Sequence, residues 1–267
     1  MSIDSCQPAA NSHQPAVPAE GQVLLGDCLA VMRSWPDGCI DHCIADPPFN
    51  ISRERGLGWA FSSHVTMQES WDRFTPDDFL EFNRCWLREV CRVVRPNGNL
   101  FVFGTYHNMY LLGYLLQHEL GRRINNSIVW FKRNAQPNIT ARTLTESTEQ
   151  ILWAVNGSAG KAKGWTFDYW RAKALNGGVQ MRNLWEFPVT PRRERRLGRH
   201  PSQKPLELLE RIVEIGTAPG ELLLDPFGGA GTLALAAERL GRRWVLIESV
   251  PEYADLARRR LDDMQSR

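Results

Sequence analysis

Residues 221–232 read Glu-Leu-Leu-Leu-Asp-Pro-Phe-Gly-Gly-Ala-Gly-Thr, and this stretch decides the fold. An apolar run of strand length ends at Asp225, a glycine-rich turn follows, and a helical pattern begins at Thr232. Glycines let a backbone approach a ligand closely, and a helix N-terminus offers unpaired N–H groups. The stretch therefore predicts a ligand-binding strand–turn–helix unit of an α/β protein. A dinucleotide fingerprint would need a further glycine at Ala234, so an NAD-dependent oxidoreductase is disfavoured.

Further apolar runs of strand length predict the rest of a sheet. Several are hydrophobic almost throughout, which is typical of strands buried on both faces. Helical patterns lie between some of them, and the one at residues 232–240 ends at Gly241. Alternating strands and helices predict a Rossmann-like, mostly parallel sheet of seven strands with helices on both faces. The predicted strands are 22–25, 40–45, 99–103, 127–131, 150–155, 221–224 and 243–247, and the other predicted helices are 78–94 and 206–215.

A second motif, Asp46-Pro47-Pro48-Phe49-Asn50, directly follows the buried run at residues 40–45. Its two prolines fix the backbone as it leaves the strand, and neither has an N–H group to donate. The motif predicts a carboxylate, a rigid carbonyl group and an exposed aromatic ring at the carboxyl edge of the sheet, where α/β proteins bind ligands. Such a group suits an exocyclic amine on a flat base, because it offers two acceptors and a ring for stacking.

Composition excludes several classes of protein. The chain has 267 residues, 43% of them hydrophobic, which allows a sizeable core. No apolar run approaches the ~18 residues that span a bilayer, and the N-terminus lacks a signal pattern, so we expect no membrane segment. Six cysteines without a CxxC pair favour a reducing cytoplasm. Cys39 and Cys43 flank His42, a cluster that we interpret as packing rather than as a metal site.

Residues 157–205 are strongly basic. They carry eleven lysines and arginines against three acids, an excess of eight, so that the rest of this chain of net charge +2 carries −6. Aromatic side chains alternate with cations around residues 165–170, and residues 180–183 hold amide and guanidinium groups that are able to read base edges. A solvated arginine-rich loop is the plain alternative. The pattern favours contact with a polyanion, with the arginine run at residues 192–199 on phosphates.

Together with shorter motifs, these stretches resemble the S-adenosylmethionine-dependent DNA amino-methyltransferases of the beta group. In that group the catalytic tetrapeptide lies near the N-terminus and the cofactor motif near the C-terminus, a circularly permuted order that this chain shares. The resemblance covers residues 22–261 and implies a methyltransferase domain with a small target-recognition insertion. The matching motifs, in family order, are Gly26-Asp27 before Pro36-Asp37-Gly38, Asp46–Asn50, Arg95–Gly98, His200–Pro205, Asp225–Thr232 and Glu248.

The resemblance assigns roles to residues of these motifs. The Asp46 carboxylate and the Pro47 carbonyl would accept hydrogen bonds from the target amine, and Phe49 would stack on the flipped base. The implied catalytic residues are Asp46, Pro47, Pro48 and Phe49, and the implied S-adenosylmethionine-binding residues are Asp27, Lys204, Asp225, Phe227, Gly228, Gly229, Gly231, Thr232 and Glu248. The expected DNA-binding residues are Lys161, Lys163, Arg171, Lys173, Arg182, Arg192, Arg193, Arg195 and Arg196, and no metal is expected.

Two of these assignments have a plain alternative. Asp27, which the resemblance places at the adenine amino group of the cofactor, stands where it could simply cap a helix. Lys204, which the resemblance places beside the methionine carboxylate, could be a solvated lysine at the start of a helix.

The expected organisation is a flexible tail at residues 1–20, a catalytic half at 21–156, a target-recognition insertion at 157–199 and a cofactor-binding half at 200–267. The resemblance implies methylation of N6 of a flipped adenine at specific sites in double-stranded DNA, because relatives that act on cytosine N4 usually carry serine in place of Asp46. Cytosine N4 is the alternative target, and a non-catalytic DNA-binding module is the alternative class. The implied partners are DNA, a second copy of the chain and a cognate restriction endonuclease.

Overall fold

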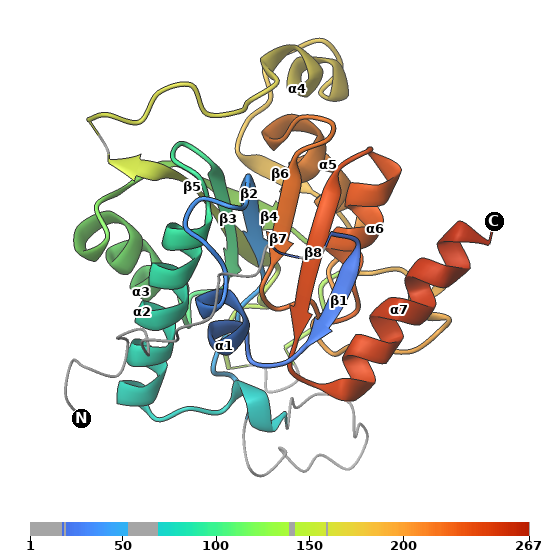
Figure 1. Ribbon diagram of the computed structural model, residues 1–267. Coiled ribbons are helices and arrows are strands. Elements are labelled where there is room, and N and C mark those ends of the chain that lie inside the picture. The colour runs from blue at the N-terminus through green and yellow to red at the C-terminus, as the bar shows by residue number, and fades with distance from the viewer. Residues whose placement is uncertain (1–17, 19, 53–68, 139–141, 159, 267) are drawn as a thin grey trace.

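The computed structural model describes residues 18, 20–52, 69–138, 142–158 and 160–266, and the strands of this part form one sheet (Figure 1). Its eight strands are β1 (Gln22–Leu25), β2 (His42–Ala45), β3 (Asn99–Gly104), β4 (Arg122–Phe131), β5 (Thr148–Ser158), β6 (Leu184–Glu186), β7 (Leu222–Asp225) and β8 (Arg243–Glu248). They lie in the order β1-β8-β7-β2-β3-β5-β4-β6. Every neighbouring pair is parallel except the two pairs that include β5, so the sheet is mostly parallel, as predicted.

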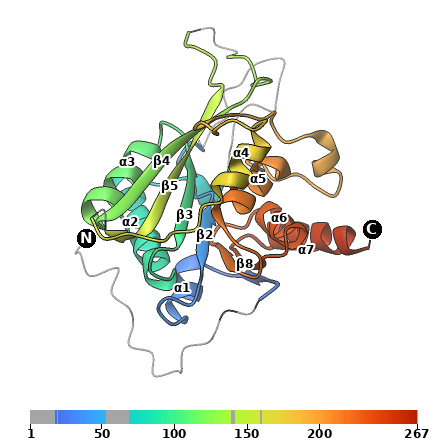
Figure 2. The same cartoon turned by 90° about the horizontal axis from the view of Figure 1, so that it is seen from above.

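Helices cover both faces of this sheet. The α-helices of the described residues are α1 (Cys28–Arg33), α2 (Pro76–Val93), α3 (Met109–Tyr114), α4 (Tyr169–Leu175), α5 (Leu206–Gly216), α6 (Thr232–Arg239) and α7 (Pro251–Gln265), with short turns of other helix types at η2 (Ser70–Asp72), η3 (Leu115–Glu119) and η4 (Arg192–Arg195). Seen from above, α1, α2 and α3 lie on one face and α4 to α7 on the other (Figure 2). Each face buries its own apolar cluster, so the sheet is the middle layer of three.

The strand order brings three acidic residues to one edge of the sheet. β7 lies between β2 and β8, with His42 opposite Leu223 and Leu224 opposite Val245. These strands are parallel and almost wholly buried, so their carboxyl ends meet. Asp46 follows β2, Asp225 ends β7 and Glu248 ends β8. The two motifs, far apart in sequence, therefore face the same side, as expected at the ligand-binding edge of an α/β sheet.

All seven predicted strands and all three predicted helices are present, and the sheet has one strand more than predicted. The eighth strand is β6, which pairs in parallel with the outer side of β4, with Trp185 opposite Trp130. β6 is only three residues long, too short to show a periodic pattern. Within the expected insertion at residues 157–199, β6 thus adds one strand to the sheet.

His42 shows why the cysteine-flanked cluster packs inside the protein. Its side chain is fully buried on β2, where Nδ1 accepts the backbone N–H of Asn99 and Nε2 lies 2.7 Å from Glu221 Oε2. Both ring nitrogens are thereby satisfied within the core, as a buried polar group requires. Because neither nitrogen of His42 is available to a metal ion, the structure supports our interpretation of the cluster with Cys39 and Cys43 as packing.

Two other expectations concern the N-terminal tail and membrane-spanning segments. The predicted flexible tail over residues 1–20 lies outside the described residues, except for Pro18 and Glu20. In the described part of the chain, none of the helices combines the length and the apolar character that crossing a membrane requires.

Candidate functional site

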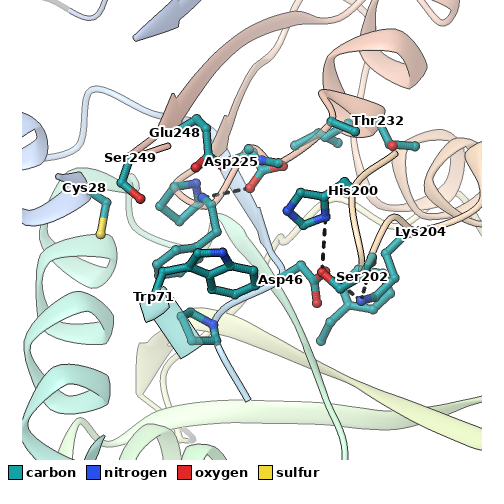
Figure 3. A pocket seen from close by; sticks show the side chains of 18 of the residues that line it. Cys28, Asp46, Trp71, His200, Ser202, Lys204, Asp225, Thr232, Glu248 and Ser249 are labelled. Carbon is teal, nitrogen blue, oxygen red and sulfur yellow. Dashed lines mark hydrogen bonds and ion pairs between the residues drawn. The ribbon is translucent and has the colours of Figure 1, made fainter. Parts of the chain in front are cut away.

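A cavity of about 320 Å³ opens at the carboxyl edge of β2, β7 and β8 (Figure 3). Residues of both motifs line it, and Figure 3 shows Asp46, Trp71 and His200 grouped around it. The segment 200–204, just before α5, forms a further wall. The structure therefore brings the two motifs singled out from the sequence into one site.

The glycine turn between β7 and α6 packs tightly on β8. The N–H group of Gly228 donates to the Ile247 carbonyl at 2.8 Å, and a Cβ atom on Gly228 would lie 1.6 Å from the side chain of Leu246. Gly231, the N-cap residue of α6, has a φ of 73°, a left-handed conformation that favours glycine. The turn thus leaves the first N–H groups of α6 at the cavity, where Thr232 also lies.

Glu248 is held in place by the backbone around it. Its Oε2 accepts the N–H of Gly229 at 2.6 Å, and its Oε1 accepts the N–H of Val250 at 2.8 Å. The carboxylate is 7% exposed and lines the cavity, so it is a fixed acceptor beside the glycine turn. Burial raises the pKa of Glu248, an effect that these N–H groups oppose.

Asp225 places a second acidic group in the cavity. Burial raises its pKa to about 8, a hydrogen bond from the Phe227 N–H opposes the rise, and repulsion from Asp46 and Glu248 adds to it. A ligand carrying positive charge would relieve this repulsion. The acidic lining therefore fits a cationic ligand, and S-adenosylmethionine carries both a sulfonium and an ammonium group.

Asp46 pairs with Lys204 across the cavity. Lys204 Nζ lies 2.6 Å from Asp46 Oδ2 and 3.3 Å from Glu149 Oε2 (Figure 3 shows Lys204 beside Asp46). Burial raises the pKa of Asp46 to about 6, with Lys204 lowering it and Glu149 and Asp72 raising it. The other oxygen, Oδ1, is fully buried and has no hydrogen-bond partner among the described residues.

Lys204 and Asp27 both line the cavity, and each also has a contact within the protein. Lys204 lines the cavity, but its ammonium group contacts Asp46 and Glu149, and it is buried rather than solvated. Asp27 caps α1 by accepting the N–H of Ala30 at 2.9 Å, which was its plain alternative. Asp27 also lines the cavity, so capping and ligand contact are compatible there.

Phe49 is buried, and the expectation of an exposed ring is wrong. Its side chain is 8% exposed and belongs to the apolar cluster on the face covered by α5 and α6. The Lys204 ammonium lies 5.1 Å from the centre of the Phe49 ring and 5.4 Å from that of Phe103. The aromatic surface beside Asp46 is therefore covered by a cation, a favourable contact for a ring face. Pro47 and Pro48 are buried as well.

Asp72 is a functional candidate that sequence reasoning missed. Its Oδ1 accepts the N–H groups of Phe49 and Asn50 at 2.7 Å, and its Oδ2 accepts those of Ile51 and Ser52 at 2.9 Å. The residue is fully buried on η2, and one carboxylate thereby fixes four successive residues after the prolines. Asp72 lies in no recognisable pattern, so only its contacts identify it.

An aromatic wall closes the cavity on the side of α7. Trp71 stacks on His200 with ring centres 5.9 Å apart, and Tyr253 meets His200 edge-on at 4.3 Å. Burial lowers the pKa of His200 to about 3, with Lys204 and Arg260 adding repulsion. The imidazole is therefore neutral at physiological pH and adds an uncharged aromatic surface to the cavity.

Of the predicted DNA-binding cations, some are exposed to solvent and others are paired with carboxylates of the protein. Lys161, Lys163, Arg182 and Arg192 are exposed, and Lys173 lies over the ring of Trp170, which is 73% exposed. Burial lowers the pKa of Arg195. Three others form ion pairs with carboxylates: Arg171 with Glu214, Arg193 with Glu207, and Arg196 with Asp263.

Comparisons with known proteins cover most of the chain. A model of the DNA methylase family N6_N4_Mtase matches residues 40–259. The chain is 40% identical to the Type II methyltransferase M2.DpnII of Streptococcus pneumoniae over 238 residues, which are 88% of this chain and 87% of that protein. It is 35% identical to the Type II methyltransferase M2.LlaDCHI of Lactococcus lactis subsp. cremoris over 252 residues, 93% of this chain and 92% of that protein.

Solved structures agree with this match. The crystal structure of the M1.HpyAVI–SAM complex has a TM-score of 0.67 and 27% identity, and the match covers 90% of this chain and 98% of that one. The cytosine-N4-specific PvuII DNA methyltransferase has a TM-score of 0.71 at 21% identity over 93% of this chain and 89% of that one, which is a likeness of fold.

Replacement of Asp72 by asparagine tests how the loop is held. In Asp72→Asn, an NH₂ group faces two backbone N–H groups that the carboxylate now accepts, and these donors become unsatisfied. We expect the free energy of unfolding to fall by about 2–4 kcal/mol in urea titrations. The control is Asp77→Asn on the exposed first turn of α2, which should cost less than about 1 kcal/mol. Equal losses in the two variants would contradict the role of Asp72.

Proposed function

Because the chain belongs to the N6/N4 DNA methylase family, we propose that it methylates the N6 amino group of adenine at specific sites in double-stranded DNA. S-adenosylmethionine is the cofactor. The observation that carries the choice of an amine as target is the buried, unpartnered Oδ1 of Asp46, a residue that lines the cavity. A buried acceptor without a donor is costly, and an entering N–H group would satisfy it.

The motif Asp46–Phe49 would act on the target amine by position and charge. An amine conjugated with its ring is a poor nucleophile, and two acceptors, the Asp46 carboxylate and the Pro47 carbonyl, would draw its hydrogens away from the ring plane. The lone pair then points to the methyl donor, and the negative charge of Asp46 stabilises the positive charge that grows on nitrogen. S-adenosylmethionine supplies the methyl group on its sulfonium. No covalent bond to the protein is needed.

The resemblance ties Asp46 to adenine, and the chemistry of its carboxylate suits an exocyclic amine as the target. A carboxylate is a charge-assisted acceptor, stronger than a serine hydroxyl, for an amine that becomes positive during transfer. The Lys204 ammonium that pairs with this carboxylate lies over the rings of Phe49 and Phe103. These rings would offer a surface on which the flipped base stacks once Lys204 has left it.

The cofactor would lie along the acidic cavity. We assign its methionine end to Asp225 and the glycine turn, its ribose to Glu248 and its adenine to Asp27. The charge of the lining supports this for the cationic methionine end, because Asp46 and Glu248 oppose ionisation of Asp225 there and a bound cation would relieve that repulsion. The complete proposed set is Asp27, Lys204, Asp225, Phe227, Gly228, Gly229, Gly231, Thr232 and Glu248.

The basic segment would contact the DNA backbone. Its exposed cations and the exposed ring of Trp170 support this proposal, whereas the ion-paired arginines would have to exchange a carboxylate for a phosphate. The relatives are Type II methyltransferases, and we infer a cognate restriction endonuclease, a homodimer and a cytoplasmic location. The proposed DNA-contacting residues are Lys161, Lys163, Arg171, Lys173, Arg182, Arg192, Arg193, Arg195 and Arg196.

The modified base identifies the reaction directly. After incubation of the protein with S-adenosylmethionine and unmethylated DNA, digestion to nucleosides and mass spectrometry should find N6-methyladenine. Long-read sequencing of the same DNA should place it in one short sequence. N4-methylcytosine as the product would overturn the choice of base and leave the family assignment standing.

Removal of the Asp46 carboxylate should stop methyl transfer and spare the cofactor. In Asp46→Ala we expect kcat to fall at least about 100-fold, which corresponds to ~3 kcal/mol, with cofactor affinity by calorimetry changed only a few-fold. The pKa of Asp46, raised to about 6, sets the pH dependence of the wild type. Below pH 6 the carboxyl group is protonated and is a weaker acceptor, so kcat should fall with decreasing pH. A kcat that is flat from pH 7 to 5 would contradict this role.

Cofactor binding should release a proton from Asp225. In the free protein its pKa is raised to about 8, so the group is protonated at pH 7, and a bound cation favours the ionised form. Affinity should therefore rise with pH up to about 8, and calorimetry in buffers of different ionisation enthalpy should show the release. In Asp225→Asn this proton release should be absent. Protons released by the ligand's own groups contribute equally in both proteins, so the difference between the two proteins reports on Asp225. The same proton count in both would refute the assignment.

A further inference from the structure

Lys132, Glu149, Lys204 and Asp46 form a row of alternating charges, in which Lys204 and Asp46 line the cavity. Lys132 Nζ lies 3.1 Å from Glu149 Oε1, Glu149 Oε2 lies 3.3 Å from Lys204 Nζ, and Lys204 Nζ lies 2.6 Å from Asp46 Oδ2. The side chains of Glu149 and Lys204 are 13% and 6% exposed. Two ammonium groups and two carboxylates balance, which makes this row tolerable inside the protein.

The ammonium group of Lys204 occupies the place where a target base is needed. It contacts the carboxylate of Asp46 and lies over the ring of Phe49, the two groups that the proposed function gives to the amine and to the base. A base cannot stack on Phe49 while the ammonium covers that ring. Lys204 therefore has to move when the target enters, and its charge needs another buried partner.

Glu149 is placed to be that partner. Its Oε2 is buried and, within the described residues, has no hydrogen-bond partner of good geometry. The Lys204 ammonium lies 3.3 Å away, which is longer than an ideal charge-assisted hydrogen bond. A shift of less than about 1 Å would close this hydrogen bond. Lys132 Nζ donates a hydrogen bond to the other oxygen, Oε1, and Glu149 lies on β5 opposite Trp130 of β4. The position of the Glu149 carboxylate is therefore fixed.

We propose that Glu149 is a positioning residue for methyl transfer, which takes the Lys204 ammonium from Asp46 when the target amine enters. The inference rests on the proposed function of Asp46. It assigns a role to a residue outside all the motifs recognised in the sequence. Burial would raise the pKa of Glu149, but Lys204 and Lys132 outweigh burial and hold it below the usual value, so Glu149 is ionised and available.

Glu149→Gln is the first test. With the charge of Glu149 gone, Lys204 stays on Asp46 and competes with the amine, so kcat/KM for DNA should fall about 10- to 100-fold. Cofactor affinity should change less than about threefold. The DNA carries the methylation site found by sequencing. Glu119→Gln removes an exposed carboxylate of η3 that pairs with Arg84 of α2, outside the cavity and the basic segment, and it serves as the control that keeps wild-type kinetics.

The pH profile separates positioning from mere structural support. Asp46 faces Lys204, Glu149, Asp72 and Asp225, and of these Glu149 and Asp72 oppose its ionisation. Asp225, whose pKa is raised to about 8, is itself protonated at the pH where Asp46 titrates. In Glu149→Gln one repulsion is lost and Lys204 remains on Asp46, so the acid limb of kcat should move to lower pH while the maximum falls. Simple loss of packing would lower the maximum and leave the limb in place, which would overturn the proposal.

A double-mutant cycle with Lys204→Met decides whether Glu149 acts through Lys204. If it does, Glu149→Gln should have little further effect on kcat/KM in the Lys204→Met background. Additive effects would overturn the proposal. Glu149→Asp keeps the charge, so it should retain most activity and the wild-type acid limb. This variant tests the proposal even if Glu149→Gln fails to fold, and its loss of activity would overturn the proposal. Wild-type kinetics in Glu149→Gln with an inactive Asp46→Ala would refute this inference alone, whereas an active Asp46→Ala would refute the proposed function.

Discussion

The buried ammonium group of Lys204 is the interaction on which the rest of the site depends. Asp46, Glu149, Asp225 and Glu248 all come to the carboxyl edge of the sheet, and a buried carboxylate without a partner is costly. Lys204 pairs with two of them, backbone N–H groups hold Glu248, and protonation is the remaining solution for Asp225. The edge is thus assembled around positive charge, from the protein or from a ligand.

The topology explains why these acids meet although the chain order is permuted. Parallel strands place their last residues at one edge, whichever strand comes first in the chain. β2 belongs to the first third of the sequence and pairs with β7, which belongs to the last, so Asp46 and Asp225 become neighbours. What the site requires is the adjacency of β2, β7 and β8, and the permutation leaves that adjacency unchanged.

Local patterns revealed most of the fold and only part of the site. The buried runs and the turn at residues 228–231 are continuous in sequence, so the strands and the cofactor turn could be predicted. Asp72 and Glu149 could not, because each acts through contacts with groups 17 or more residues away that no spacing reveals. The burial of Phe49 was missed for the same reason, since Lys204, 155 positions later, covers its ring. The ion pairs of Arg171 and Arg196 likewise depend on helices distant in sequence.

The contact between Lys204 and Asp46 also indicates what the site binds best. An ammonium group is a cationic nitrogen held by a carboxylate over an aromatic ring, and the target amine becomes such a nitrogen only as the methyl group arrives. A site that holds Lys204 in this way is therefore more complementary to the transition state than to the neutral amine. The same complementarity makes Lys204 a strong competitor of the entering base. A second carboxylate at the far side of Lys204, as Glu149 provides, lets the protein keep the complementarity and still admit the substrate.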